Sequence, residues 1–193
     1  MNFNRADIQH VDRFIINGET MALLPMLQPE NIYTHMIGLK EEKIVSKRPS
    51  YVIDHSCRYY GSSFQGRRVG TKELIGITHK PPIVIDPSNS IYFFPTTSPT
   101  KPQCAWLSHS HITNFQKVEN NRTSIQFMNG TSITVDVSFN SFSNQFYRTA
   151  QLRTVVTSRI EEEQRKLNLM LFHDGQKSML YEQIIREFRK GIK

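Results

Sequence analysis

One hairpin pattern constrains the fold of this chain more than any other feature. Residues 124–128 and 131–137 flank an Asn129-Gly130 pair, and the second segment alternates apolar with polar or acidic residues. Alternation at every second position is typical of a strand with one buried face, and Asn-Gly favours the tight type I′ turn. The sequence therefore predicts an antiparallel β-hairpin here.

The region before this hairpin shows more strand signals than helix signals. A second Asn-Gly pair, Asn17-Gly18, separates residues 13–16 from residues 19–24 and predicts another hairpin. Proline and glycine then punctuate a series of short apolar segments, since proline fixes its own φ and disfavours helix at the preceding residue. These predicted strands lie at residues 43–53, 74–78, 83–85, 91–94 and 105–109. Many short strands indicate an antiparallel sheet, either curled or sandwiched.

The last third of the chain changes to a helical period. A helix is expected to begin at Asn140 or Ser141 and to end near residues 161–163, where three glutamates interrupt the apolar pattern. Its apolar face contains Phe142, Phe146, Thr149, Val156 and Ile160. Because Arg153 lies near this face, either it pairs with a buried carboxylate or the face meets something other than core.

A second helix is expected over residues 177–190, with Gly191 as its stop. The predicted fold class is α+β, with a β-rich antiparallel body followed by C-terminal helices. The expected regions are residues 1–139, the body with the basic segment, and residues 140–193, a helical region.

Size and composition indicate an ordinary globular protein. The 193 residues are 38% hydrophobic and 21% charged, enough to build a core without covalent links. Residues 1–10 lack the apolar run of a signal peptide, and no stretch has the roughly 18 apolar residues that span a bilayer. We therefore expect a cytoplasmic protein without a membrane partner, in which Cys57 and Cys104 stay reduced.

The positive charge is concentrated in one segment. The whole chain carries a formal charge of +7, and residues 43–80 alone hold eight basic against two acidic residues. A local positive field attracts polyanions, of which nucleic acid is the commonest inside cells, although a solvated basic face has the same composition. Arginines beside aromatic residues and between glycines favour the nucleic-acid interpretation.

Catalytic and metal-binding patterns are weak. Cys57, Cys104, His109 and His111 have the right chemistry for zinc, with His55 and His79 nearby in sequence, but a structural zinc site usually shows two closely spaced ligand pairs. Only His109 and His111 are close, and strand alternation would place them on one face. No nucleophile, phosphate-loop or paired-carboxylate motif is present, so we expect a non-enzyme without cofactor.

Four long segments carry a more specific signal. Residues 55–63 read HSCRYYGSS, residues 79–89 HKPPIVIDPSN, residues 102–111 PQCAWLSHSH and residues 140–150 NSFSNQFYRTA. In this order they resemble the competence transcription factor ComK family over most of the chain. The resemblance implies an activator of competence genes that binds paired AT-rich boxes in double-stranded DNA, largely through the minor groove, as a dimer or higher oligomer.

The candidate DNA-binding residues come from the basic segment and the start of the first C-terminal helix. They are Arg58, Arg67, Arg68, Lys72, Lys80, Asn144 and Arg148. For each, the alternative is an ordinary surface or an intramolecular ion pair. The competing functions are a zinc-supported nucleic-acid enzyme or RNA-binding protein, and a module that binds only proteins.

The resemblance also implies regulated proteolysis. Family members are delivered to a Clp protease by an adaptor protein that binds a short apolar C-terminal segment. The matching residues here are Leu169, Met170, Leu171 and Phe172. The alternative for this segment is an apolar strand packed on the body.

Overall fold

The structure, a computed structural model, describes residues 8–171 together with residues 183 and 186. Contacts divide the chain into two compact units, Met1–Val155 and Val156–Lys193. The division expected at residue 139 stays a prediction. Apart from residues 183 and 186, the helix expected over residues 177–190 lies outside the described residues.

The predicted hairpin over Asn129-Gly130 is confirmed, although its turn differs. In the three-stranded sheet of order β10-β9-β8, Ser132 pairs with Gln126 and Val135 with Thr123. Gly130 has a φ of +84° whereas Asn129 is not in the positive-φ region, so the turn is not type I′, which needs both. Its strands are β8 (Ile112–Val118), β9 (Arg122–Phe127) and β10 (Ser132–Val135).

A larger sheet forms the centre of the first unit. Its strand order is β1-β4-β3-β2-β7-β6-β5, and every pair is antiparallel except β1 with β4. Its strands are β1 (Gln9–Val11), β2 (Thr20–Leu27), β3 (Ile32–Gly38), β4 (Glu42–Val45), β5 (Ile83–Asp86), β6 (Ile91–Pro95) and β7 (Trp106–Ser108). The described residues thus have the predicted α+β class, a mainly antiparallel body followed by a C-terminal helix.

Two helices replace strands expected in the basic segment. Helix α1 (Pro49–Tyr59) follows β4 directly, and helix α2 (Phe64–Ile75) ends at Gly76, whose φ of +72° is the left-handed cap conformation. The strand predictions for residues 43–53 beyond β4 and for residues 74–78 are therefore wrong. Proline is favoured in the first helical turn, so Pro49 was a start signal rather than a strand break.

The hairpin expected over Asn17-Gly18 is also wrong. Residues 13–16 form no strand, and the backbone of Ile16 bonds instead to side chains of α1 and of its C-terminal cap. The N–H of Ile16 donates to Ser56 Oγ at 3.0 Å, and the hydroxyl of Tyr60 donates to the carbonyl of Ile16 at 3.1 Å. These partners lie 40 and 44 positions further along the chain, so a local pattern could not reveal them.

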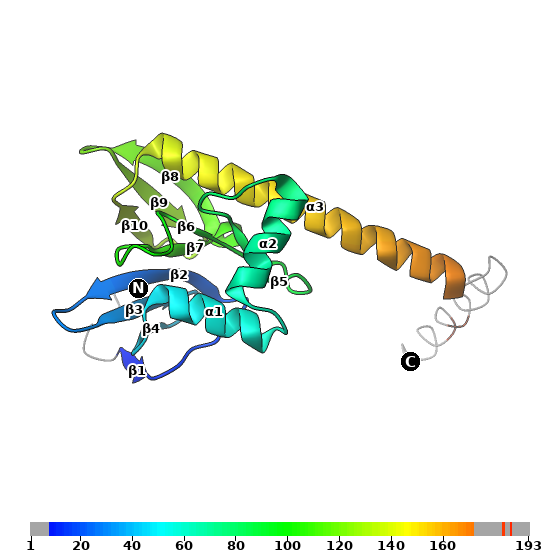
Figure 1. The fold of residues 1–193 in the computed structure, drawn as a ribbon, viewed down its shortest axis with the longest axis horizontal. Helices are drawn as coiled ribbons and strands as arrows, with labels where there is room; N and C mark the ends of the chain where they lie inside the picture. Colours follow the sequence, from blue (N-terminus) through cyan, green and yellow to red (C-terminus); the bar gives the residue numbers. More distant parts are fainter. Residues whose placement is uncertain (1–7, 172–182, 184–185, 187–193) are drawn as a thin grey trace. The chain divides into compact units, whose positions relative to one another are not determined.

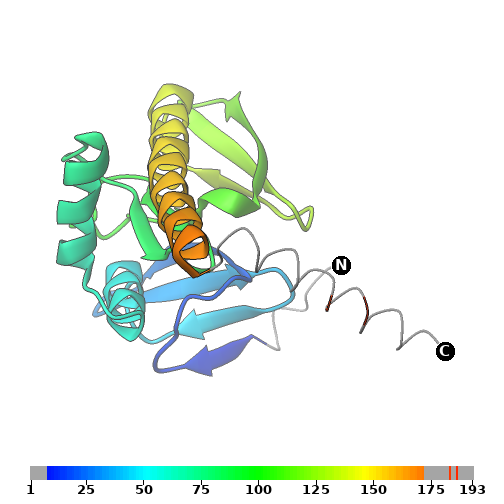
Figure 2. The ribbon, with the colours of Figure 1, turned by 90° about the vertical axis from the view of Figure 1, so that its right-hand side faces the viewer.

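The first unit has three layers (Figure 1). Helices α1 and α2 cover one face of the seven-stranded sheet, and Figure 2 shows them on the same side of the strands. Leu23, Phe93 and Trp106 point into the core on the helix side, whereas their neighbours Phe94 and Leu107 join the core on the other side. Because both faces are covered, β5 and β6 are buried at every position, which explains their continuous apolar sequence.

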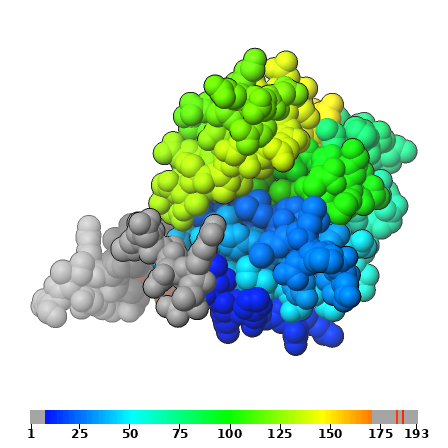
Figure 3. Space-filling model, turned by 90° about the vertical axis from the view of Figure 1, so that its left-hand side faces the viewer, coloured from blue at the N-terminus to red at the C-terminus, as the bar shows by residue number. Residues whose placement is uncertain are grey.

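The second core joins the two sheets. Ile125 and Phe127 of the three-stranded sheet pack with Phe94 and with Phe142 from the start of helix α3 (Phe139–Leu171). Figure 3 shows the blue N-terminal strands and the green-to-yellow segment of the three-stranded sheet packed against each other on one face.

Helix α3 begins near its predicted start but continues past its predicted end. Residues 161–163 stay helical as part of a polar surface, where Lys166 Nζ lies 3.0 Å from Glu162 and 2.9 Å from Glu163. Ion pairs three and four residues apart stabilise an exposed helix, so loss of the apolar pattern did not mark its end. Within the described residues, no helix combines the length and the apolarity needed to cross a membrane.

Candidate nucleic-acid interface

A groove of about 570 Å³ opens between the beginnings of α1 and α2 and two loops. We call it the cationic groove. It is lined by Arg48, Ser50, Tyr51, Asp54, Phe64, Gln65, Arg68, Thr78, His79, Lys80, Pro81, Ser98, Pro99 and Thr100. A smaller hollow of about 180 Å³ shares Arg48, Ser50, Pro99 and Thr100 with it and adds Lys101, so the cationic surface continues toward β3.

Asp54 fixes the two helices that form the groove walls. Its Oδ1 accepts the backbone N–H of Phe64 at 3.0 Å, which satisfies a donor at the start of α2, and its Oδ2 pairs with Arg58. The Phe64 ring in turn meets the Trp106 ring edge-on at 5.7 Å, which ties the start of α2 to the core. The groove is therefore positioned by the core and not by loops alone.

The groove keeps its positive charge available to a ligand. Asp54 is the one carboxylate among the described residues that line it, and Arg58 already neutralises this side chain. No described carboxylate lies within ion-pair distance of Arg48, Arg68 or Lys80. In addition, α1 begins here without a side-chain cap, and the positive end of its helix dipole favours an anion.

Two of the sequence-predicted residues line the groove, and a third lies beside it. Arg68 is exposed, with its guanidinium 5.7 Å from the Phe64 ring centre and 3.2 Å from Gln65 Oε1. Lys80 enters from the opposite loop. Lys72 is exposed one helical turn beyond Arg68 and lies on the same side of α2.

Arg58 and Arg67 are engaged within the protein. Arg58 pairs with Asp54, although 70% of its side chain stays exposed, and it is not among the residues that line the groove. Arg67 instead turns toward the sheet, where its Nη2 donates to the carbonyl of Ile85 at 3.4 Å. The structure therefore separates Arg67 from its neighbour Arg68, although both were expected at DNA.

Helix α3 contributes its candidates through a contact with Lys80. Lys80 Nζ donates to Ser141 Oγ at 3.3 Å, and the amide of buried Gln145 donates to the carbonyl of Lys80 at 2.7 Å. Arg148 donates to Oε1 of the same glutamine at 3.4 Å, and Asn144 is exposed on the adjoining surface. The start of α3 thus supports the loop that presents Lys80.

Sequence reasoning missed Arg48 and Lys101 as groove residues. Arg48 was counted in the basic segment, but only the Arg-Pro sequence before a helix hints that it caps α1. Lys101 belongs to a neutral stretch of sequence and reaches the same surface through the fold. No local signal could have assigned it.

The residues considered for zinc do not assemble into a site. The described residues contain no group of three histidines, cysteines or carboxylates placed to hold a metal ion. Cys57 and Cys104 are reduced and buried, and burial raises the pKa of their thiols to about 12 and about 11. The strand expected at His109 and His111 is wrong, because the two residues lie in a short 3-10 helix.

These histidines belong to the core between the two sheets. The His109 ring stacks on Phe146 with centroids 4.4 Å apart, and no described residue bonds to either ring nitrogen. Burial, assisted by the charge of Arg153, lowers the pKa of His109 to about 4. The carboxylate partner considered for Arg153 is not found among the described residues.

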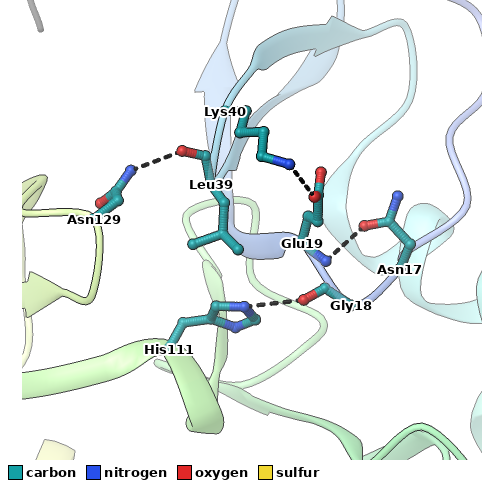
Figure 4. Close-up of polar contacts among 7 residues, drawn as sticks. All are labelled: Asn17, Gly18, Glu19, Leu39, Lys40, His111 and Asn129. Atoms are coloured by element: carbon teal, nitrogen blue, oxygen red, sulfur yellow. Dashed lines mark hydrogen bonds and ion pairs between the residues drawn. The ribbon is translucent and has the colours of Figure 1, made fainter. Parts of the chain in front are cut away.

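A second charged region lies where β2, β3 and β4 turn, and here the cations have partners. Lys40 Nζ lies 3.0 Å from Glu19, as Figure 4 shows, and Lys43 Nζ lies 2.8 Å from Glu41. We call this region, defined by Glu19, Lys40, Glu41 and Lys43, the paired corner. The same view shows His111 bonded to the carbonyl of Gly18 at 3.1 Å, which joins the corner to the 3-10 helix.

The candidate adaptor segment is helical as far as Leu171, so the alternative of an apolar strand is wrong. Leu169 is 58% exposed and Met170 is 77% exposed. Phe172 lies outside the described residues. The two exposed side chains are accessible in the form that the structure describes.

The fold and groove define an α+β protein with a groove in which basic side chains outnumber the one carboxylate among its described lining residues. The family model described as ComK protein matches residues 11–161, and the chain belongs to the ComK family. It is also 41% identical over 179 residues to the "Competence transcription factor" of Bacillus subtilis (strain 168), a match that covers 92% of this chain and 93% of the relative. No solved structure matches the chain significantly.

Proposed function

We propose that this protein is a DNA-binding transcription activator of competence genes and that the cationic groove holds the DNA. The observation that carries the proposal is that Arg48, Arg68 and Lys80 line one groove without carboxylate partners among the described residues. Family membership and the description of the Bacillus subtilis relative support the biological role.

The chemistry of the groove suits a phosphate backbone. Arginine forms forked hydrogen bonds to phosphate, and lysine adds a mobile point charge. Neutralising phosphates releases counterions, so affinity must fall as salt is added. A module that binds only proteins would lack this response to DNA and salt.

The finer part of the proposal is recognition of paired AT-rich boxes through the minor groove. The narrow minor groove of A-tracts concentrates negative potential and attracts arginine, and Arg68 is the exposed arginine of the pair in α2. The base edges in the minor groove separate A·T from G·C pairs but carry little further sequence information. An oligomer whose geometry matches the spacing of the boxes would supply the remaining selectivity.

The proposed partners besides DNA are further copies of the chain and a Clp-protease adaptor. The exposed Leu169 and Met170 provide an accessible apolar segment for such an adaptor. Cytoplasmic localisation, with association to the nucleoid when DNA is bound, completes the proposal.

A substitution of base pairs tests the proposed readout. Replacing A·T by I·C pairs preserves the acceptor pattern of the minor groove but changes the major groove, because inosine lacks the 2-amino group of guanine. Binding of the full chain to a duplex with paired boxes should survive this change and should be lost with G·C pairs. Loss on I·C duplexes would contradict minor-groove reading, and no salt-dependent binding to any duplex would contradict DNA binding itself.

A further inference from the structure

Helix α1 presents a row of aromatic and basic side chains on its outer face. Tyr51, His55 and Tyr59 follow at intervals of four residues, which places them next to each other on the helix surface, and Lys47 lies just before the helix begins. The Tyr51 and His55 rings stack with centroids 5.7 Å apart, and Lys47 Nζ lies 5.7 Å from the Tyr51 ring centre. We call these four residues the α1 row.

The row is not needed to pack α1 on the sheet. The opposite face of the helix already buries Val52, Ile53 and Cys57 in the core. Tyr59, by contrast, is 68% exposed and Tyr51 is 38% exposed. Exposed aromatic rings beside cations are a common feature of surfaces that bind nucleic acids, and stability alone does not require them.

The row begins at the cationic groove. Tyr51 lines the groove together with Arg48, and Arg58 lies on the same helix between His55 and Tyr59. A strand whose phosphates lie along the groove would therefore have aromatic rings within reach of its bases. The row itself contains no carboxylate, and the nearby Asp54 is paired with Arg58.

The exposed rings fit bases that are not stacked in a duplex. In double-stranded DNA the faces of the bases are covered by their neighbours, and only base edges and backbone are accessible. In a single strand the faces are open and stack on aromatic side chains with little dependence on sequence. AT-rich DNA, the proposed target, is also the DNA whose strands separate most readily.

We propose that the α1 row binds unstacked bases of single-stranded DNA, next to the groove that holds the duplex. This inference rests on the proposed function and adds a second binding activity to it. A protein docked on the same row is the competing interpretation, and the experiment below separates the two.

The test compares two DNA probes with the full chain. Fluorescence anisotropy measures binding to a labelled single-stranded oligothymidine and to an AT-rich duplex with paired boxes. Tyr59→Ala should weaken single-strand binding by about fivefold or more, in line with loss of one stacking contact, and should change duplex binding by less than about twofold, because Tyr59 does not line the cationic groove.

Two control variants make the result specific. Tyr147→Ala removes a ring that is 63% exposed on α3, and it should change neither affinity. Tyr59→Phe keeps the ring and should keep single-strand binding. Circular dichroism should be unchanged in all three, since the substituted side chains lie at the surface.

Each other outcome overturns the inference in a recognisable way. Unchanged single-strand binding in the Tyr59→Ala variant would show that the row serves another partner, such as a protein. Equal weakening of both probes would make the row part of the duplex site. If the native chain binds the duplex but not oligothymidine, the proposed single-strand binding is contradicted. If it binds neither probe, the proposed function itself is contradicted.

Discussion

The cationic groove and the paired corner contain the same kinds of basic residues but differ in what surrounds them. At the corner, Lys40 and Lys43 each have a carboxylate within 3.0 Å, so their charges are largely balanced inside the protein. In the groove, Arg48, Arg68 and Lys80 face a shared hollow without such partners among the described residues. The difference teaches that pairing, more than the number of basic residues, decides which surface attracts a polyanion.

Position along the chain explains the difference. The two regions lie at opposite ends of β4, the corner at the turn before Glu42 and the groove where Val45 leads into α1. Lys43 and Arg48 therefore belong to one basic segment of sequence but to different surfaces. The net charge of the segment does not show that these two residues belong to different surfaces.

The largest expected effect comes from removing groove charges. Arg48→Ala combined with Arg68→Ala should weaken binding to an AT-rich duplex by about 30- to 100-fold near 0.1 M salt, because about two phosphate contacts are lost. The slope of log affinity against log salt should fall by about 1.8. Anisotropy titrations over a range of salt concentrations measure both quantities.

The matched control removes the same number of charges from the paired corner. Lys40→Ala with Lys43→Ala should change duplex affinity by less than about threefold, since both lysines are paired with carboxylates and neither lines the cationic groove. If the corner variant lost as much affinity as the groove variant, net charge and not pairing would govern binding.

Acid should lower the free energy of unfolding through His109, which lies on the side of the seven-stranded sheet away from the groove. The folded state keeps His109 neutral with a pKa of about 4, whereas the unfolded chain binds a proton near its ordinary value of 6.5. The unfolded state then holds more protons between these values, so the free energy of unfolding decreases as pH falls from about 6.5 toward 4. Residue His109 as a whole is only partly buried, which limits the loss to about 1–2 kcal/mol.

Urea unfolding at pH 7 and pH 5 measures this dependence, and His109→Phe provides the comparison. Phenylalanine keeps a ring against Phe146 and cannot be protonated, so the variant should lose part of the acid sensitivity. An identical decrease in both proteins would show that other groups cause it.

A smaller effect should separate Arg67 from Arg68. Arg67→Ala removes the hydrogen bond to the Ile85 carbonyl and should lower the free energy of unfolding by about 1 kcal/mol. Arg68→Ala should change stability by less than about 0.5 kcal/mol while it weakens DNA binding. Urea titrations measure the free energy of unfolding of each single variant, and anisotropy measures its affinity for the AT-rich duplex. The reverse assignment, with Arg67 needed for binding and Arg68 for stability, would break the account of α2.

Local patterns predicted one part of the fold well. The hairpin of β9 and β10 is encoded by alternation and by Gly130, whose positive φ few other residues adopt easily, so neighbouring residues were enough. Helices α1 and α2 were missed although Pro49, Ser63 and Gly76 mark their ends. Their buried faces include Ser56 and Thr71, so the apolar period was weak.

The site was predicted only in part for a related reason. The sequence directed attention to Arg68 and Lys80, which line the groove, but could not place Arg48 or Lys101 beside them. It also could not separate Arg67 from Arg68, because that depends on the rotation of α2 against β5. Long-range contacts, such as Lys80 with Ser141, decide which charges share a surface.

Lysine acetylation with and without bound DNA tests most directly where the duplex lies. The full chain is treated with a limiting acetylating reagent, and mass spectrometry follows each lysine. Saturating AT-rich duplex should protect Lys80 and Lys101 at the groove and leave the highly exposed Lys40 at the corner labelled as in the free protein. Protection of Lys40 with continued labelling of Lys80 and Lys101 would contradict the claim that unpaired groove cations hold the DNA.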